Sequence, residues 1–268
     1  MDFTSWPALL VVDTEGNGTS LPDLVELAAL PVCGGAADKT IAGAWLVRPE
    51  RPVTPRATSV HGLTNAVLAS APFWADIASE VHAFLGSSWI CAHNAHTDYR
   101  VMKAHLPAWE PSGVLDTLRL SRATFPDLPG YSLDHLIEHL KPDLSEAPAQ
   151  RHRATFDAFA TAQLLVIMAD RYETWDQVVS AAVPPTLPGA PPAGTRPHSV
   201  VKPPGVRARH GSRERRCTGE GRRERPPCRL RPSCAEGPWA SAELTHPRAA
   251  RREPLRGRSR SPAGPPHR

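Results

Sequence analysis

The sequence has 268 residues, of which 31 are lysine or arginine and 27 are aspartate or glutamate, giving a formal net charge of +4 at pH 7. Residues 1–190 carry 21 acidic and 12 basic residues, whereas residues 191–268 carry 6 and 19, so the two parts have net charges of −9 and +13. No apolar run approaches the roughly 18 residues of a membrane span, and no basic leader precedes the first apolar run. These features argue against membrane insertion and secretion, and we expect a cytoplasmic protein.

The composition also divides the chain into a domain, a linker and a tail. Residues 183–195 are rich in proline and glycine, and in residues 196–268 arginine, proline, glycine, alanine and serine dominate. The second segment contains a single aromatic residue, Trp239. Such a segment cannot bury enough apolar surface to offset the conformational entropy lost on folding. We therefore predict a globular domain at residues 5–182, a linker at 183–195 and a disordered basic tail at 196–268.

The tail has two interpretations. Clustered arginines bind phosphate backbones without sequence preference, so the tail could tether the protein to nucleic acid. Alternatively, arginine, proline, glycine and alanine all have GC-rich codons, and the segment is then the unselected translation of GC-rich DNA. The five cysteines show no C-x-x-C pair or zinc-like spacing, which fits a reducing compartment.

The first part of the predicted domain reads as three strands. Residues 7–13 form a short apolar run that stops at a glycine and asparagine cluster, which is typical of a buried strand. Residues 22–32 and 40–50 predict two more strands, broken by Gly34 and Gly35, in an antiparallel meander with the first. Residues 53–64 contain proline and glycine, and we predict a loop there.

Helices and strands then alternate along the chain. Apolar residues at helical spacing predict a helix at 73–87, and a short apolar run predicts a strand at 88–95. Further elements are expected as a helix at 96–106, a strand turning into a helix at 113–124, a helix capped by Ser132 at 131–140 and a long buried helix at 154–172. This order predicts an α/β fold with a mixed five-stranded sheet flanked by helices.

Acidic residues recur where the predicted strands and helices meet. Asp13 and Glu15 end the first strand, and strand positions i and i+2 point to the same face. Two buried carboxylates repel each other unless a cation lies between them, so this pair favours a hard cation such as Mg²⁺ or Mn²⁺. Asp98 and Asp157 stand at the starts of predicted helices. Taken singly, each acid is also explained as a polar turn residue or as a partner of the helix dipole.

In chain order, the segments VVDTEGNG, AHNAHTDYRVM and HRATFD resemble the three motifs of the DEDDh group of 3′-to-5′ exonucleases, which includes the proofreading epsilon subunit of bacterial DNA polymerase III. The resemblance covers about residues 8–170 and none of the tail. It implies a ribonuclease H-like fold and hydrolysis of nucleic acid from the 3′ end to nucleoside 5′-monophosphates, as in DNA proofreading or repair. It implies single-stranded DNA or RNA 3′ ends as partners, and leaves association with a DNA polymerase and the oligomeric state open.

The resemblance also implies the site. Two Mg²⁺ or Mn²⁺ ions would be held by the four acids of the motifs, and such ions stabilise the attacking and leaving oxygens of an in-line displacement. A histidine, with an ordinary pKa of about 6.5, is suited to take the proton of the attacking water. The implied catalytic residues are Asp13, Glu15, Asp98, His152 and Asp157, of which the four acids are the metal ligands. The expected substrate contacts are Thr14, Gly16, His61 and Asn94.

Geometry constrains the third motif. Residues five apart on an α-helix are about 140° out of phase, so His152 and Asp157 could not face one site if both were helical. We therefore expect His152 in the loop before the helix, with Thr155 as the N-cap. Two departures from the family pattern, Gly16-Asn17-Gly18 in the first motif and Thr97 in the second, put substrate preference in doubt.

Other functions stay open on the sequence alone. An oligoribonuclease that trims RNA would belong to the same family. A ribonuclease H-like endonuclease shares the carboxylate cluster but lacks the histidine and aspartate of the third motif. A catalytically silent module that binds nucleic acid or a polymerase is the third alternative.

Overall fold

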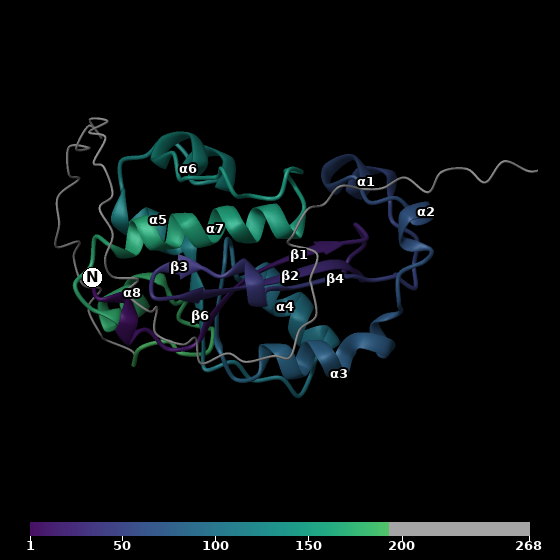
Figure 1. Cartoon of the computed structure of the whole chain (residues 1–268), viewed down its shortest axis with the longest axis horizontal. Coiled ribbons are helices and arrows are strands. Elements are labelled where there is room, and N and C mark those ends of the chain that lie inside the picture. Colours follow the sequence, from purple (N-terminus) through teal and green to yellow (C-terminus); the bar gives the residue numbers. More distant parts are fainter. Residues whose placement is uncertain (193–268) are drawn as a thin grey trace, which may run out of the picture.

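The computed structural model of the chain describes residues 1–192, in which a mixed sheet carries helices on both faces (Figure 1). The predicted tail at 196–268 and the last residues of the predicted linker, 193–195, lie outside the described residues. Residues 183–192, the first part of that linker, pack against the edge of the sheet. There the backbone N–H of Val114 donates to the carbonyl of Pro188 at 2.9 Å.

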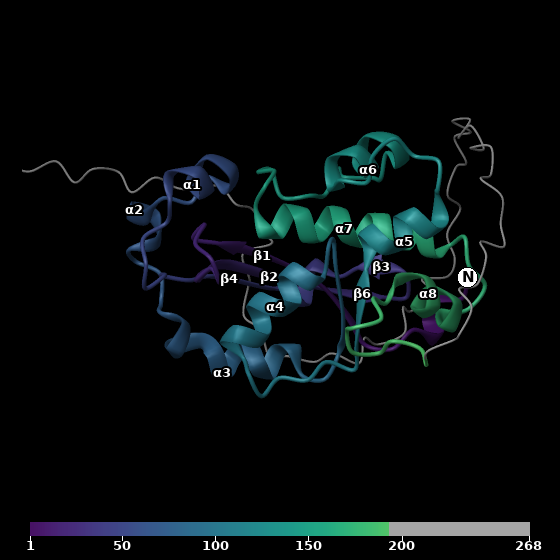
Figure 2. The same ribbon diagram turned by 180° about the vertical axis from the view of Figure 1, so that it is seen from behind.

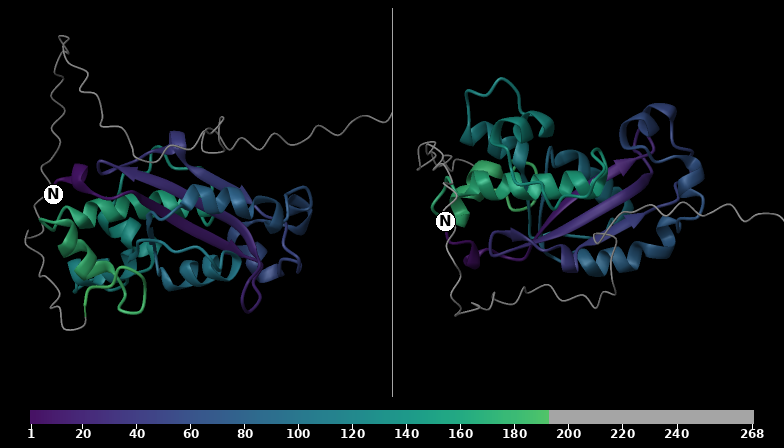
Figure 3. Two further views of the ribbon diagram at one scale, coloured as in Figure 1. Left: turned by 90° about the horizontal axis from the view of Figure 1, so that it is seen from below. Right: turned by 45° about the horizontal axis from the view of Figure 1, so that its top comes forward.

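The sheet is built from an antiparallel half and a parallel half. Strands β1 (Leu9–Gly16), β2 (Leu24–Cys33) and β4 (Gly43–Leu46) form the predicted antiparallel meander, with β2 between the other two (Figure 3). Strand β5 (Trp89–Ala92) pairs in parallel with β1, and β6 (Gly113–Asp116) pairs in parallel with β5. The main strand order is β3-β2-β1-β5-β6. The predicted mixed α/β sheet is therefore confirmed.

The number of strands differs from the prediction, because the sheet formed by residues 1–192 has six strands and five were expected. The additional strand, β3 (Ala36–Ala37), pairs with the end of β2. Gly34 and Gly35 have φ values of 57° and 77°, which other residues adopt with strain, and they reverse the chain tightly enough for this pairing. The two glycines thus make a hairpin, where the sequence predicted only a break between strands.

Apolar side chains of β1 alternate between the two faces of the sheet. Leu9 and Val11 pack with residues of helix α7 (Ala154–Ala169), whereas Leu10 and Val12 pack with helices α3 (Trp74–Leu85) and α4 (His96–His105). Figures 1 and 2 show α7 on one side of the sheet and α3 and α4 on the other. Since side chains alternate with a period of two, the next odd-numbered residues of β1 point toward α7.

The hydrophobic core on the α7 side also includes residues of three further helices, α5 (Thr117–Thr124), α6 (Leu133–Leu140) and α8 (Trp175–Ala182). Helix α8 was not predicted from the sequence, although Thr174 caps it by accepting a hydrogen bond from the backbone N–H of Gln177. Short 3₁₀ turns occur at Phe3–Ser5 and Lys39–Ile41. Within residues 1–192, no helix combines the length and hydrophobicity that a membrane span requires.

The prediction of a loop at residues 53–64 is wrong. This segment contains helix α1 (Pro55–His61), which is followed by the short helix α2 (Asn65–Leu68). Proline is favoured in the first turn of a helix, and the Thr54 side chain accepts a hydrogen bond from the backbone N–H of Ala57. Gly62, with φ of 75°, ends the helix in the left-handed conformation. The proline and glycine that suggested a loop are therefore start and stop signals of one helix.

Candidate active site

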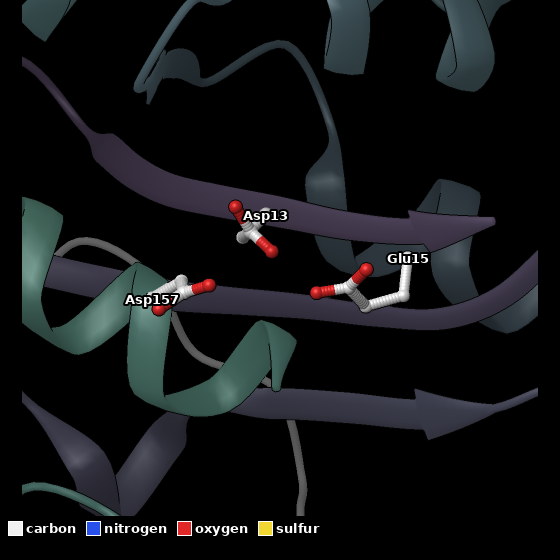
Figure 4. A group of neighbouring side chains, drawn as sticks. All are labelled: Asp13, Glu15 and Asp157. Atoms are coloured by element: carbon white, nitrogen blue, oxygen red, sulfur yellow. The ribbon is translucent and has the colours of Figure 1, made fainter. Parts of the chain in front are cut away.

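Three carboxylates meet between β1 and the first turns of α7. Asp13 and Glu15 project from β1 toward Asp157 on α7 (Figure 4). Each residue offers a carboxylate oxygen, and these three atoms lie within 4.8 Å of one another. The structure thus brings together three of the four predicted metal ligands. The alternation of β1 explains the arrangement, because it places both strand acids on the face that α7 covers.

Negative charge is unfavourable on each carboxyl group of this carboxylate trio, as the raised pKa values of all three show. Burial, followed by the negative charges of Asp98 and Glu15, raises the pKa of Asp13 well above its usual range. Burial and the charge of Asp157 raise the pKa of Glu15 to about 8. Burial raises the pKa of Asp157 to about 6, and His152 opposes that shift. A divalent cation would supply the positive charge that lets all three stay ionised, so the donor set fits such an ion.

Asp98 lies beside the trio and binds the edge of β1. The parallel pairing of β1 with β5 ends at Val11 and Cys91, so the following backbone groups of β1 are free to bond with α4. Asp98 Oδ1 accepts hydrogen bonds from the backbone N–H of Thr14 at 3.0 Å and from its hydroxyl at 2.8 Å. Burial raises the pKa of Asp98 to about 7, although these bonds favour the ionised form. Asp98 is the fourth predicted ligand, but it is not part of the cluster within 4.8 Å.

Thr14 and Gly16, two of the predicted substrate contacts, lie next to these acids in β1 and each has a role in the fold. The backbone N–H and hydroxyl of Thr14 both bond to Asp98. A Cβ on Gly16 would lie 2.6 Å from the Cβ of Pro22, which is closer than real carbon atoms approach. Glycine is therefore required at position 16 by packing, and a role of either residue in substrate binding stays a prediction.

His152 lies in the turn before α7, as expected from the spacing of the third motif. It is exposed and has a φ of 55°, a left-handed conformation that is uncommon outside glycine. The prediction of Thr155 as the N-cap is wrong, because the cap residue is Arg153, whose side chain makes no capping hydrogen bond. The carboxylate of Glu26, on β2, accepts a hydrogen bond from the backbone N–H of Ala154 at 3.0 Å instead. A carboxylate from the sheet therefore replaces the local cap.

The roles of Glu26 and Arg153 were not predicted from the sequence. Glu26 is 2% exposed and lies among buried apolar residues of β2. Its side chain forms two hydrogen bonds with the guanidinium of Arg153, at 2.8 and 2.6 Å. The available signal was an isolated charge in an otherwise apolar strand, because a buried charge requires a partner.

The remaining predicted contacts lie in different environments. His61 is 2% exposed in the last turn of α1, where its Nδ1 accepts a hydrogen bond from the backbone N–H of Leu63 at 3.0 Å. Burial lowers the pKa of this imidazole. Asn94 is exposed after β5 with φ of 66°, and its backbone N–H donates to Asp116 Oδ1 at 3.0 Å. Asn94 is thus accessible to a ligand, whereas His61 is buried.

Comparison with known proteins agrees with this geometry. A family model described as exonuclease (RNase_T) matches residues 10–165. Exodeoxyribonuclease 10 of Escherichia coli K12 is 32% identical over 181 residues, which cover 67% of this chain and 77% of that protein. A DNA polymerase III subunit epsilon-like protein of Rhodobacter capsulatus is 34% identical over 163 residues, covering 58% of this chain and 22% of that protein. A solved structure of exonuclease X in complex with 5′ overhanging duplex DNA is similar with a TM-score of 0.55 and 31% identity, covering 63% of this chain and 96% of that chain.

Proposed function

The chain belongs to this exonuclease family and is a hydrolase of the 3′-to-5′ exonuclease class, and from this premise we propose that it removes nucleoside 5′-monophosphates from the 3′ ends of DNA. The observation that carries the proposal is the carboxylate trio, whose oxygens lie within 4.8 Å of one another. The names of the relatives favour DNA, since one is an exodeoxyribonuclease and another was solved with duplex DNA. RNA trimming is the second candidate within the family, and association with a DNA polymerase stays a prediction.

We assign the metal ligands as follows. Asp13, Glu15 and Asp157 would hold one divalent cation, Mg²⁺ or Mn²⁺, and Asp13 and Asp98 would contribute to a second. Cations at such positions stabilise the negative charge that develops on the attacking and leaving oxygens. The fit is supported by the raised pKa values of the three carboxyl groups, which arise first from burial and then from the negative charges around them. Arg153 is paired with Glu26, and its positive charge only partly opposes the raised pKa of Glu15.

His152 is proposed as the general base. It lies at the rim of the trio, exposed to solvent, in the turn that leads into the helix carrying Asp157. A neutral imidazole there accepts a proton from the attacking water and releases it to solvent. The exposed position is compatible with this exchange, and the fixed start of α7 limits the space that the ring can explore.

The proposal is tested by digestion of matched 5′-labelled DNA and RNA oligonucleotides with Mg²⁺ or Mn²⁺. We expect wild-type protein to produce ladders shortened from the 3′ end, faster on DNA than on RNA. Asp13→Asn and His152→Ala should each lower the rate at least about 100-fold, because a proton-transfer group or a ligand is lost. Glu138→Gln removes an exposed carboxylate on α6 and should leave the rate unchanged. Internal cuts, or intact DNA after incubation with wild-type protein, would refute the assignment.

A further inference from the structure

A cavity opens beside the second motif, between α5 and the chain that follows α8. Its volume is about 520 Å³. Its lining includes two residues of the second motif, two arginines of α5 and two prolines after α8, namely Asn94, His96, Arg119, Arg122, Pro184 and Pro185. None of the carboxylates of the trio contributes to it, so the cavity is separate from the proposed catalytic centre.

The cavity and the trio lie at the same end of the sheet, where the parallel strands β5 and β6 finish. Strands β1, β5 and β6 are parallel and adjacent in this order. Asp13 lies two residues beyond the last pair of β1 with β5, Asn94 follows β5, and Asp116 is the last residue of β6. Neighbouring strands are about 4.8 Å apart, which puts the cavity on the order of 10 Å from β1 along this edge. Ligands of open α/β sheets bind outside the carboxyl ends of the strands. A chain-like ligand anchored at the trio can therefore reach the cavity.

The charges of the cavity favour an anion. Residues 1–190 have a net charge of −9, and many of their cations are engaged, as in the ion pairs of Arg51 with Asp23 and Lys103 with Glu110. By contrast, Arg119 and Arg122 form no ion pair with any residue in 1–192. The one acidic residue of the lining, Asp116, already accepts hydrogen bonds from two backbone N–H groups through Oδ1.

Arg119 also has an unsatisfied donor. Its Nε is buried and has no hydrogen-bond partner among the described residues. A buried donor without a partner costs free energy, so such groups in native proteins generally bond to a ligand, an ion or water. Arg122, one helical turn further along α5, lies over the ring of Tyr131 with 5.6 Å between the guanidinium carbon and the ring centroid. Arg122 is exposed, and this contact holds a second guanidinium beside the cavity.

We propose that this cavity binds a phosphate group of the substrate strand, upstream of the phosphodiester bond that is cut. Arginine presents planar paired donors that match phosphate oxygens, and two such side chains one turn apart can clamp a single phosphodiester group. The site holds the strand while its 3′ end lies at the trio, so the inference rests on the proposed exonuclease function. A free mononucleotide offers the same chemistry, and the experiment separates the two sources.

The test measures binding and cleavage separately. Binding of a 5′-fluorescein-labelled 12-nucleotide oligothymidylate is followed by anisotropy in EDTA, from 50 to 200 mM salt. Displacement of this 12-mer by thymidine 5′-monophosphate is followed in the same way, and cleavage of a thymidine dinucleotide is followed with Mn²⁺. Arg119→Gln and Arg122→Gln should each weaken 12-mer binding about tenfold at low salt and reduce the slope of log K against log salt by about 0.7, the value for one phosphate contact on a single strand. Dinucleotide cleavage should stay at the wild-type rate.

Two further variants control for charge and folding. Arg48→Gln removes the same charge beyond β4, which pairs with β2 on the side away from β1 and β6, and should bind the 12-mer like wild type. Arg122→Lys keeps the charge and should retain the wild-type salt slope. Thermal unfolding midpoints confirm that each variant is folded.

The outcomes are distinct. The cavity proposal is overturned if the two glutamine variants bind the 12-mer like Arg48→Gln, or if they lose dinucleotide cleavage in proportion to binding. It is also overturned if they lose affinity only for thymidine 5′-monophosphate, which would make the cavity a product site. Failure of the wild-type protein to cleave either substrate would refute the proposed function, while the binding measurement would still report on the cavity.

Discussion

Glu26 and Arg153, 127 positions apart in the sequence, form a buried ion pair beside the carboxylate trio, with two hydrogen bonds of 2.8 and 2.6 Å. The same carboxylate accepts the backbone N–H of Ala154, the first residue of α7. Glu26 also pairs with Glu15 across β1 and β2. Arg153 therefore neutralises a carboxylate that would otherwise add negative charge to the trio, and the pair fixes the start of the helix that carries Asp157.

Breaking this pair should lower both stability and activity. Glu26→Gln leaves the guanidinium of Arg153, whose side chain is 18% exposed, without its charged partner. Removing one member of a buried pair lowers the free energy of unfolding by about 3 kcal/mol, which urea unfolding would measure. Because the start of α7 loses its anchor, we expect the rate of DNA digestion to fall about tenfold or more even in the folded fraction.

An exposed ion pair in the same region is the matched control. Arg151 and Asp134 are paired with side chains that are 53% and 59% exposed. Exposed pairs contribute less than about 1 kcal/mol, so Asp134→Asn should leave the unfolding free energy and the digestion rate nearly unchanged. Equal decreases of the unfolding free energy and the digestion rate in Glu26→Gln and Asp134→Asn would contradict a special role for the pair of Glu26 and Arg153.

The raised carboxyl pKa values predict that the metal-free protein loses stability as pH rises. The pKa values of Glu15, about 8, and Asp98, about 7, exceed those of the unfolded chain. The folded state therefore binds more protons than the unfolded state, and stability falls with pH until these groups have ionised. Between pH 7 and 9, where unshifted carboxyl groups are already ionised, we expect the melting temperature in EDTA to decrease.

Divalent metal should reverse this loss. A cation that binds only the folded protein stabilises it, and its affinity rises as the carboxyl groups lose their protons. The stabilisation by added Mg²⁺ or Mn²⁺ should therefore be larger at pH 9 than at pH 7. Asp13→Asn should show a smaller pH dependence in EDTA and a smaller metal effect. A metal-free melting temperature that rises from pH 7 to 9 would contradict the prediction.

The sequence predicted the parts of this site that depend on local periodicity. The alternation of residues 7–13 placed Asp13 and Glu15 on one face, and the five-residue spacing put His152 outside the helix that carries Asp157. The bond between Asp98 and Thr14 could not be predicted, because it depends on where β5 ends relative to β1. Glu26 is an isolated charge in an apolar strand, but its partners lie 127 and 128 residues away and depend on how α7 packs on the sheet.

Removing the hydroxyl of Thr14 should weaken metal binding. Thr14→Val keeps the shape of the side chain and the backbone N–H bond to Asp98, but it deletes the 2.8 Å bond from the hydroxyl. That bond favours ionised Asp98, so its loss raises the pKa of this carboxyl further. A hydrogen bond to a charged group contributes about 1.5 kcal/mol, which corresponds to roughly tenfold weaker Mn²⁺ binding in calorimetry at pH 7. Thr14→Ser keeps a hydroxyl and should bind Mn²⁺ like wild type, and equal affinities for all three proteins would contradict the argument.

A substitution at Gly16 should test packing separately from chemistry. The Cβ of an alanine at position 16 would lie 2.6 Å from the Cβ of Pro22. Gly16→Ala must therefore displace the end of β1 or the segment that follows it. Overpacking of this kind costs about 1 to 3 kcal/mol, which urea unfolding would detect. Pro22→Gly removes the opposing carbon atoms, so the double variant should be more stable than expected from the sum of the two single changes. Additive losses would show that position 16 needs glycine for a reason other than contact with Pro22.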